Sequence, residues 1–138
     1  MTDKGITRVK VDTLHPTAGY SHATVVEAGR LAFLAGQVPL DPSGTIVGLG
    51  DVAAQVDQVV ASSLATLAAV GAAPSDVVRS VIYVASDDNA TLVAVWERLT
   101  GSALGPAFTT ASTLVGVARL GYTGQLVEVE LTAALLDR

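Results

Sequence analysis

Apolar positions in the first part of the chain form short clusters with the lengths of β-strands. Three such clusters cover residues 7–11, 23–27 and 31–35. The last is a continuous apolar run that ends at Gly36, a pattern typical of a strand buried on both faces. Only residues 28–30 separate the second cluster from the third, which predicts a hairpin and antiparallel pairing of these two strands.

The middle of the chain changes to helical periodicity. From residue 51 to 70, apolar residues recur three and four apart, which predicts a helix with Asp51 as N-cap and Gly71 just past its end. A second helix is expected from Asp88 to Gly101, and the β-branched run 77–84 between them predicts a core strand. The residues expected to face inward are Val52, Val56, Val59, Val60, Leu64, Leu67 and Ala68 in the first helix, and Leu92, Val95, Trp96 and Leu99 in the second.

Two further strands are expected at about 113–117 and 126–135. In the last strand, side chains alternate between faces, so Glu128 and Glu130 share one face about 7 Å apart. The opposite face carries Val127, Val129, Leu131 and Ala133 and should pack under the helices. A carboxylate such as Glu128 could position water or accept a proton if burial raises its pKa. The other interpretation is a pair of solvated or salt-bridged glutamates.

The order of these elements is β-β-β-α-β-α-β-β. It predicts an α+β fold in which a single mixed β-sheet carries two helices on one face. The length of 138 residues suits a single domain over residues 1–138.

Composition narrows the possible partners and locations. Half of the residues are hydrophobic, yet no uncharged apolar run approaches the ~20 residues of a membrane helix, so the apolar surplus predicts association with copies of the same chain. The absence of cysteine and of a secretory signal makes a cytoplasmic location the expectation. A net charge of -5, with only eight Lys and Arg, disfavours a nucleic-acid partner. The two histidines, His15 and His22, make a poor metal site, and no metal or cofactor is expected.

Several motifs in order point to a family. Residues 19–23 read Gly-Tyr-Ser-His-Ala, residues 31–42 read Leu-Ala-Phe-Leu-Ala-Gly-Gln-Val-Pro-Leu-Asp-Pro, and residues 127–133 read Val-Glu-Val-Glu-Leu-Thr-Ala. This series resembles the reactive intermediate deaminase (Rid) family, also called the YjgF family and labelled endoribonuclease L-PSP. The resemblance implies a chorismate-mutase-like fold and a homotrimer with ligand clefts between subunits. It also implies deaminase chemistry on enamines and imines such as 2-aminoacrylate.

One residue of the family's pattern is missing. Its deaminases hold the substrate carboxylate with an arginine, whose planar fork binds a carboxylate bidentately. An ungapped alignment puts Ser112 at that position, and an alignment with a four-residue insertion puts Phe108 there. Arg119 lies seven residues later and is expected to be an ordinary exposed strand residue, whereas Arg98 could in principle reach a neighbour's cleft.

Other pocket positions are also carried over by resemblance. Tyr20 and Glu128 keep the family's residue types and are the catalytic candidates. Ala35 replaces a serine and Val93 replaces an asparagine, so the pocket is expected to prefer a less charged, more apolar ligand. The full set of candidate ligand-binding residues is Tyr20, Ala35, Gly36, Val93, Ser112, Leu114 and Glu128.

Three hypotheses follow. The first is a trimer whose clefts bind a small metabolite without the usual imine deaminase activity. The second is a hydrolase or deaminase for an enamine, imine or amide-like substrate, with Glu128 directing water. The third is an assembly module without a small ligand.

Overall fold

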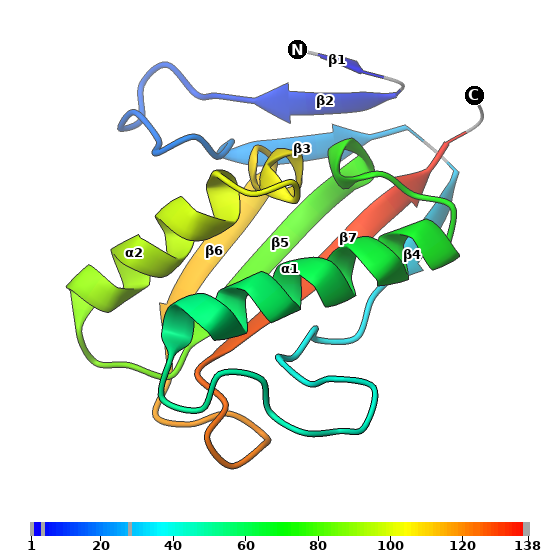
Figure 1. Ribbon diagram of the computed structural model, residues 1–138. Helices are drawn as coiled ribbons and strands as arrows, with labels where there is room; N and C mark the ends of the chain where they lie inside the picture. Colours follow the sequence, from blue (N-terminus) through cyan, green and yellow to red (C-terminus); the bar gives the residue numbers. More distant parts are fainter. Residues whose placement is uncertain (1, 4, 28, 137–138) are drawn as a thin grey trace.

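The computed structural model describes residues 2–3, 5–27 and 29–136. Two helices lie side by side across one face of a four-stranded mixed sheet, and three N-terminal strands extend beyond the sheet (Figure 1). The sheet has the order β4-β7-β5-β6, formed by Arg30–Phe33, Val127–Leu135, Val77–Val84 and Ala111–Gly116. Strands β5 and β6 run parallel, and the other pairs are antiparallel. The α+β architecture with two helices on a mixed sheet is confirmed.

The N-terminal strands form an antiparallel group, β1-β2-β3, from Thr2–Asp3, Ile6–Val9 and Ala23–Val26. An isolated parallel bridge between Ser21 and Ala111 connects the segment before β3 to the outer edge of β6. The main-chain N–H of Ser21 donates to the carbonyl of Thr110 at 3.1 Å. A small apolar cluster of Ile6, Val78 and Ala134 also packs the N-terminal strands against the sheet.

The hairpin expected between the second and third strands is wrong. Strand β3 pairs with β2, whereas β4 pairs with β7 from the other end of the chain. A short connector fixes where the next strand can begin, but it does not fix the strand's partner when a long apolar strand such as β7 offers a better one.

The expectation that residues 31–35 are buried on both faces is also wrong for the single chain. Leu31 is 45% exposed and Phe33 is 76% exposed, because β4 is an outer strand and helices cover only one face of the sheet. Leu34, by contrast, is buried in the main core. The apolar run therefore leaves two large side chains on the open face.

Both helices begin and end near the expected residues. Helix α1 covers Val52–Ala69 with Asp51 as N-cap, and the carboxylate of Asp51 accepts from the N–H of Ala54 at 3.1 Å. Gly71 follows with a φ of 80°, the left-handed conformation that glycine adopts without strain. Helix α2 covers Asn89–Thr100 with Asp88 as N-cap.

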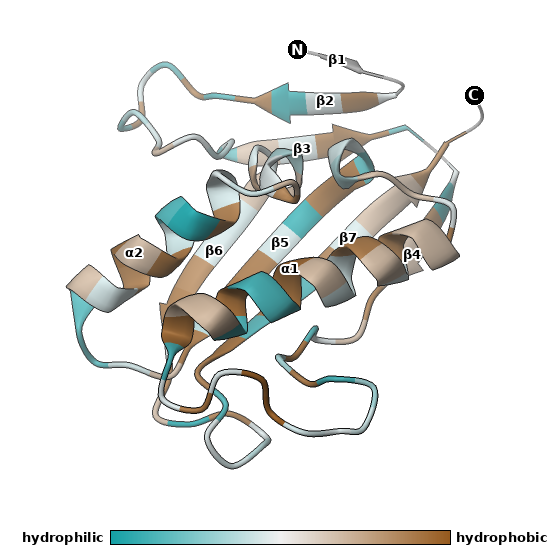
Figure 2. Ribbon diagram, in the orientation of Figure 1, coloured by the Kyte–Doolittle hydropathy of each residue, from teal (hydrophilic) through white to brown (hydrophobic). Residues whose placement is uncertain are grey.

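The core lies between the helices and the sheet. Both layers contain hydrophobic residues, drawn brown in Figure 2, and α1, α2, β5 and β7 all contribute residues to the main buried core. Val56, Val59 and Leu67 of α1 are fully buried, as expected, while Ala68 is exposed. Strand β7 alternates as the sequence predicts: its odd-numbered residues from Val127 to Ala133 are buried, and Glu128 and Glu130 point to the open face.

Candidate functional site

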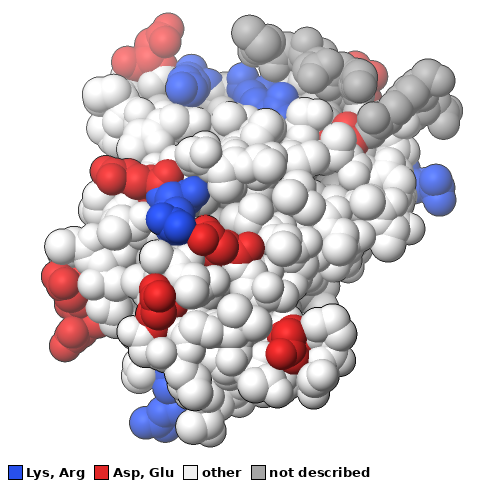
Figure 3. Space-filling view, in the orientation of Figure 1, with Lys and Arg blue, Asp and Glu red and all other residues white. Residues whose placement is uncertain are grey.

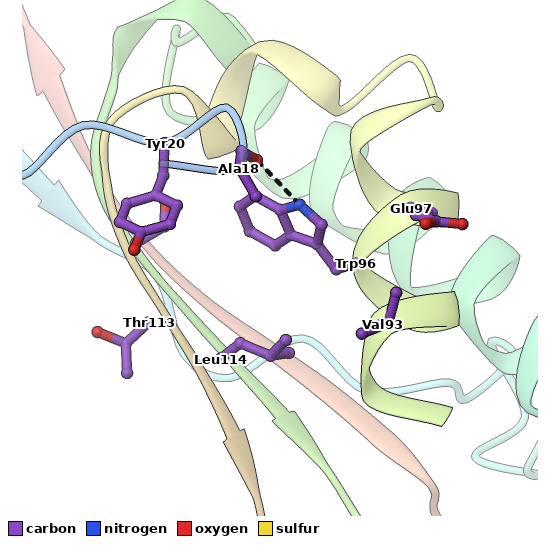
Figure 4. A pocket seen from close by; sticks show the side chains of 8 residues that line it. Ala18, Tyr20, Val93, Trp96, Glu97, Thr113 and Leu114 are labelled. Carbon is purple, nitrogen blue, oxygen red and sulfur yellow. Dashed lines mark hydrogen bonds between the residues drawn. The ribbon is translucent and has the colours of Figure 1, made fainter. Parts of the chain in front are cut away.

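A pocket of about 500 Å³ opens between the outer strand β6 and helix α2. Figure 4 shows Trp96 reaching from α2 toward Tyr20, with Leu114 and Val93 bordering the same space and Glu97 directed away from it. Its lining residues are Ala18, Tyr20, Val93, Trp96, Glu97, Ser112, Thr113 and Leu114. The structure thus brings four of the expected ligand-binding residues together, namely Tyr20, Val93, Ser112 and Leu114.

Aromatic rings form one wall of the pocket. Trp96 packs edge-to-face against Tyr20, with ring centroids 6.1 Å apart, and against Phe108 at 6.0 Å. The indole N–H of Trp96 donates to the carbonyl of Ala18 at 3.1 Å, which ties α2 to the segment before β3. Phe108 is 1% exposed, so this wall rests directly on the core.

Histidines hold the segment that carries Tyr20. His22 Nδ1 accepts from the N–H of Val11 at 3.0 Å, and its Nε2 lies 3.1 Å from the carbonyl of His15. The ring of His15 in turn lies 3.2 Å from the Tyr20 hydroxyl through Nε2. These contacts give both histidines a structural place beside the pocket. Within the described residues, no group of three or more His, Cys, Asp or Glu could hold a metal ion.

Ser112 faces the helix side of the sheet. Its hydroxyl accepts from the Ser80 hydroxyl at 2.6 Å and lies 3.1 Å from the carbonyl of Thr110, to which it donates. Phe108, the other residue aligned with the family's arginine, is buried in the core and does not line the pocket. Of these two positions, only Ser112 reaches the pocket.

Glu128 lies in a second group, on the open face of the sheet. One of its carboxylate oxygens accepts from the side-chain amide of Gln125 at 3.0 Å. Gly36 lies directly against it: a Cβ at Gly36 would be 2.1 Å from Glu128 Oε2. Gln37 bridges to Val129 through hydrogen bonds of 2.7 and 3.1 Å, which fixes residues 35–37 beside β7. Ala35, Gly36 and Glu128 therefore form one local cluster.

The two groups are separated within one chain. Ser112 pairs with Ser80 and shares the helix face with it, whereas Glu128 pairs with Tyr83 on the open face. Strand β5 also lies between β6 and β7. The expected site residues thus belong to two half-sites on opposite faces of the sheet. We call them the aromatic half-site (Tyr20, Val93, Trp96, Ser112 and Leu114) and the carboxylate half-site (Ala35, Gly36 and Glu128).

Glu130 has a partner on the open face. The hydroxyl of Tyr83 donates to its carboxylate at 3.2 Å. Burial raises the pKa of Tyr83 above its ordinary value, and the negative charge of Glu130 adds to that increase. Glu130 is therefore hydrogen-bonded to β5, and Glu128 is the carboxylate that lies against Gly36.

The two arginines considered as substitutes lie elsewhere. Arg98 forms a bidentate ion pair with Asp57 of α1, with both distances 2.8 Å. Hydrogen bonding from Arg98 lowers the pKa of Asp57 below its ordinary value. Arg119 is exposed and follows the end of β6 at Gly116, so its expected place inside the strand is wrong. On the face shown in Figure 3, charged side chains are scattered and most of the surface is uncharged.

Some residues of the site were not predicted from the sequence. Trp96 was expected only to point inward; it is half-buried and lines the pocket. Its place at the edge of the helix's apolar face was the available signal. Gln125 was not predicted as a partner of Glu128 because it lies in a turn, where a polar residue is ordinary. The buried Gln55 was missed for another reason. Its side chain hydrogen-bonds to Gly48, Gly124 and Leu126 and so joins α1, the loop before α1 and the segment before β7, which no local pattern shows.

Helix α1 is long and apolar enough, by composition, to cross a membrane, and it is the one such helix among the described residues. Its buried face packs against the sheet, as a core helix does. A single helix of this kind is weak evidence for a membrane span.

Comparisons with known proteins agree on one family. The endoribonuclease L-PSP family model matches residues 11–135. The solved structure of YyfB from Yersinia pestis, a Rid family protein of unknown function, aligns with a TM-score of 0.86 and 34% identity, covering 95% of this chain and 99% of YyfB. Rv2704 from Mycobacterium tuberculosis, of the YjgF/YER057c/UK114 family, aligns with a TM-score of 0.62 and 27% identity over 94% of this chain and 99% of its own.

Curated relatives match over a shorter part. Protein DfrA of Myxococcus xanthus is 47% identical over 64 residues, 46% of this chain and 49% of that protein. The RutC family protein PH0854 of Pyrococcus horikoshii is 37% identical over 68 residues, 49% of this chain and 52% of that protein. The matched part of the chain spans about half the length of each of these relatives.

Proposed function

The chain belongs to the endoribonuclease L-PSP (Rid/YjgF) family, and we propose that it is a homotrimer whose inter-subunit clefts bind a small metabolite without efficient hydrolysis of 2-aminoacrylate-type imines. The observation that carries the proposal is the separation of the two half-sites. Neither half-site holds all of the expected site residues, and a neighbouring subunit can place its carboxylate half-site opposite the aromatic half-site.

The open face of the sheet supports association. Leu31 and Phe33 of β4 leave large apolar surfaces in water, on the same face as Glu128 and next to the carboxylate half-site. Covering such side chains with a second copy removes apolar area from water at a gain of roughly 25 cal/mol per Å². An interface there would also bring the carboxylate half-site to a subunit boundary.

The chemistry of the aromatic half-site supports the lack of imine hydrolysis. Among the described residues that line the pocket, none is Lys or Arg, and the hydroxyl of Ser112 is already bonded within the chain. A substrate carboxylate brought into this pocket would lose water without gaining a cationic partner, which costs several kcal/mol. We therefore expect weak binding of 2-aminoacrylate.

The test measures assembly and activity on the same sample. Sedimentation should give the mass of three chains. Ammonia and keto-acid release from 2-aminoacrylate generated in situ should be at background for the wild type and should appear in the Ser112→Arg variant, with Ser112→Ala as the control that lacks a cation. Efficient hydrolysis by the wild type, or a monomeric mass, would contradict the proposal.

A second candidate function is favoured by the contacts of Glu128. Gln125 donates to one carboxylate oxygen, and the other oxygen packs against Gly36, where a Cβ would lie only 2.1 Å away. A carboxylate so oriented suits a hydrolase or deaminase in which Glu128 directs water onto an enamine, imine or amide-like substrate. For any substrate found, Glu128→Gln should abolish turnover and leave the trimer intact, and activity that survives this change would exclude the role.

A further inference from the structure

The aromatic half-site has few polar groups to offer a ligand. The Trp96 indole N–H is bonded to Ala18, the Tyr20 hydroxyl lies beside His15, and the Ser112 hydroxyl is bonded to Ser80 and Thr110. Because these groups already have partners inside the chain, a ligand meets mainly ring faces and the aliphatic side chains of Val93 and Leu114.

The charge of the pocket also favours an uncharged ligand. Among the described residues that line the pocket, Glu97 is the one charged residue, and its side chain is directed away from Tyr20 and Trp96 (Figure 4). The nearest cation along α2, Arg98, is held by Asp57. An anionic ligand would meet no opposite charge there, and burying it would be unfavourable.

The neutral hydroxyl of Thr113 and the main chain of β6 supply the polar contacts that remain. Strand β6 is an outer strand of the four-stranded sheet. Its bridge to the segment before β3 joins Ala111 to Ser21, at the start of β6. Outer strands present main-chain N–H and C=O groups that can pair with a neutral donor or acceptor. Leu114 lies on this strand at the floor of the pocket.

We propose that the pocket between β6 and α2 selects uncharged ligands that combine a flat aromatic or unsaturated apolar group with a neutral amide or carbonyl, and that Trp96 is the residue that determines this specificity. The proposal rests on the cleft of the proposed function and names the class of ligand that the cleft takes. The flat group packs against the indole of Trp96, and the amide pairs with the edge of β6.

Benzamide and benzoate are suitable probes because they share a ring and differ in charge. Trp96 is the one tryptophan of the chain, so its indole N–H gives a single NMR signal that reports binding at this wall. In the wild type, benzamide should shift this signal with a Kd at least about tenfold lower than that of benzoate. Acetamide, which lacks the ring, should bind more weakly than benzamide by a similar factor.

Two variants separate charge from ring recognition. Val93→Arg adds a cation at a position that is 51% exposed, so it should fold normally and reverse the preference toward benzoate. Leu49→Arg adds the same charge at a residue that is 71% exposed and outside the pocket, and it should leave the ratio unchanged. Trp96→Ala, followed through the main-chain signal of Leu114, should remove the advantage of benzamide over acetamide.

Three results would overturn the inference: benzoate binding as tightly as benzamide in the wild type, an unchanged ratio in Val93→Arg, or a ring preference that survives Trp96→Ala. The sedimentation test of the proposed function is independent of these outcomes. Because Trp96, Val93 and Leu114 all belong to one chain, the ligand preference can be measured whether or not the trimer forms, and a trimer can form even if the preference fails.

Discussion

The aromatic half-site and the carboxylate half-site are built in opposite ways. The aromatic half-site packs on the core through Phe108, and the polar groups of Trp96 and Ser112 are hydrogen-bonded to other groups of the same chain. The carboxylate half-site lies on an uncovered face of the sheet, beside Leu31 and Phe33. The fold of one chain therefore shapes the first half-site, whereas the second is left on a face of the sheet that the chain's own helices do not cover.

The largest effect is expected from Phe108→Ala, which removes the support of the aromatic half-site. Phe108 is fully buried between Trp96 and the core, so its truncation should lower the free energy of unfolding by about 3–5 kcal/mol. Urea denaturation measures the loss. The control is Tyr122→Ala, at an aromatic residue that is 51% exposed, which should change stability by less than about 0.5 kcal/mol. Equal losses in the two variants would contradict the prediction that burial of Phe108 stabilises the fold.

Phe33→Glu tests whether the open face is an interface between copies. A carboxylate placed in an apolar contact would lose hydration without a partner, so association should weaken by about tenfold or more while the monomer stays folded. Sedimentation over a concentration series measures this shift. Leu49→Glu is the matched control at a similarly exposed leucine, and a trimer equally stable in both variants would place the interface elsewhere.

Gly36→Ala acts on the carboxylate half-site alone. The new methyl group would overlap Glu128 Oε2, so the flexible carboxylate should swing away and lose its hydrogen bond from Gln125. Stability should change by no more than about 1 kcal/mol, because the end of a side chain moves rather than the backbone. The side-chain amide NMR signals of Gln125 report the change. Gly121→Ala, which meets open space, should leave these signals in place.

The smallest effect is expected from Asp57→Asn, on the outer surface of the helices. The hydrogen bond from Arg98 lowers the pKa of Asp57 from 3.8, so this contact stabilises the folded chain above about pH 4, and the contribution is lost as the pH falls through the lowered pKa. Both groups are about half exposed, so solvent screens the pair. The Tm should fall by no more than about 2 °C at pH 7, and wild type and variant should converge near pH 2. A difference that grows as the pH falls would contradict this sign.

Local chemistry made much of the fold predictable. Helix α1 begins after Asp51 and ends before Gly71. Both limits were predictable because a carboxylate N-cap and a left-handed glycine act within one turn of the helix. The alternation in β7 placed Glu128 opposite the helices for the same reason, since neighbouring side chains of a strand must point to opposite faces. Among the site residues, Tyr20, Val93, Ser112 and Leu114 were identified by resemblance, and the structure places them around one pocket.

Interactions between distant segments were not predictable in the same way. The contact of Trp96 with Tyr20 joins residues 76 positions apart, and the hydrogen bonds of Gln55 join three separate segments. The partner of β4 is β7 rather than its neighbour in sequence because strand pairing is decided by which apolar surfaces meet in the folded sheet.

The sequence by itself determined the order and limits of the helices and most strands, the faces of β7, and the family, because these depend on periodicity, caps and short motifs. Only the tertiary structure decided that the candidate residues divide into two half-sites, because that division depends on strand order and on which face of the sheet the helices cover. Side-chain alternation is a local property, whereas the pairing of β5 with both β6 and β7 joins segments far apart in the chain.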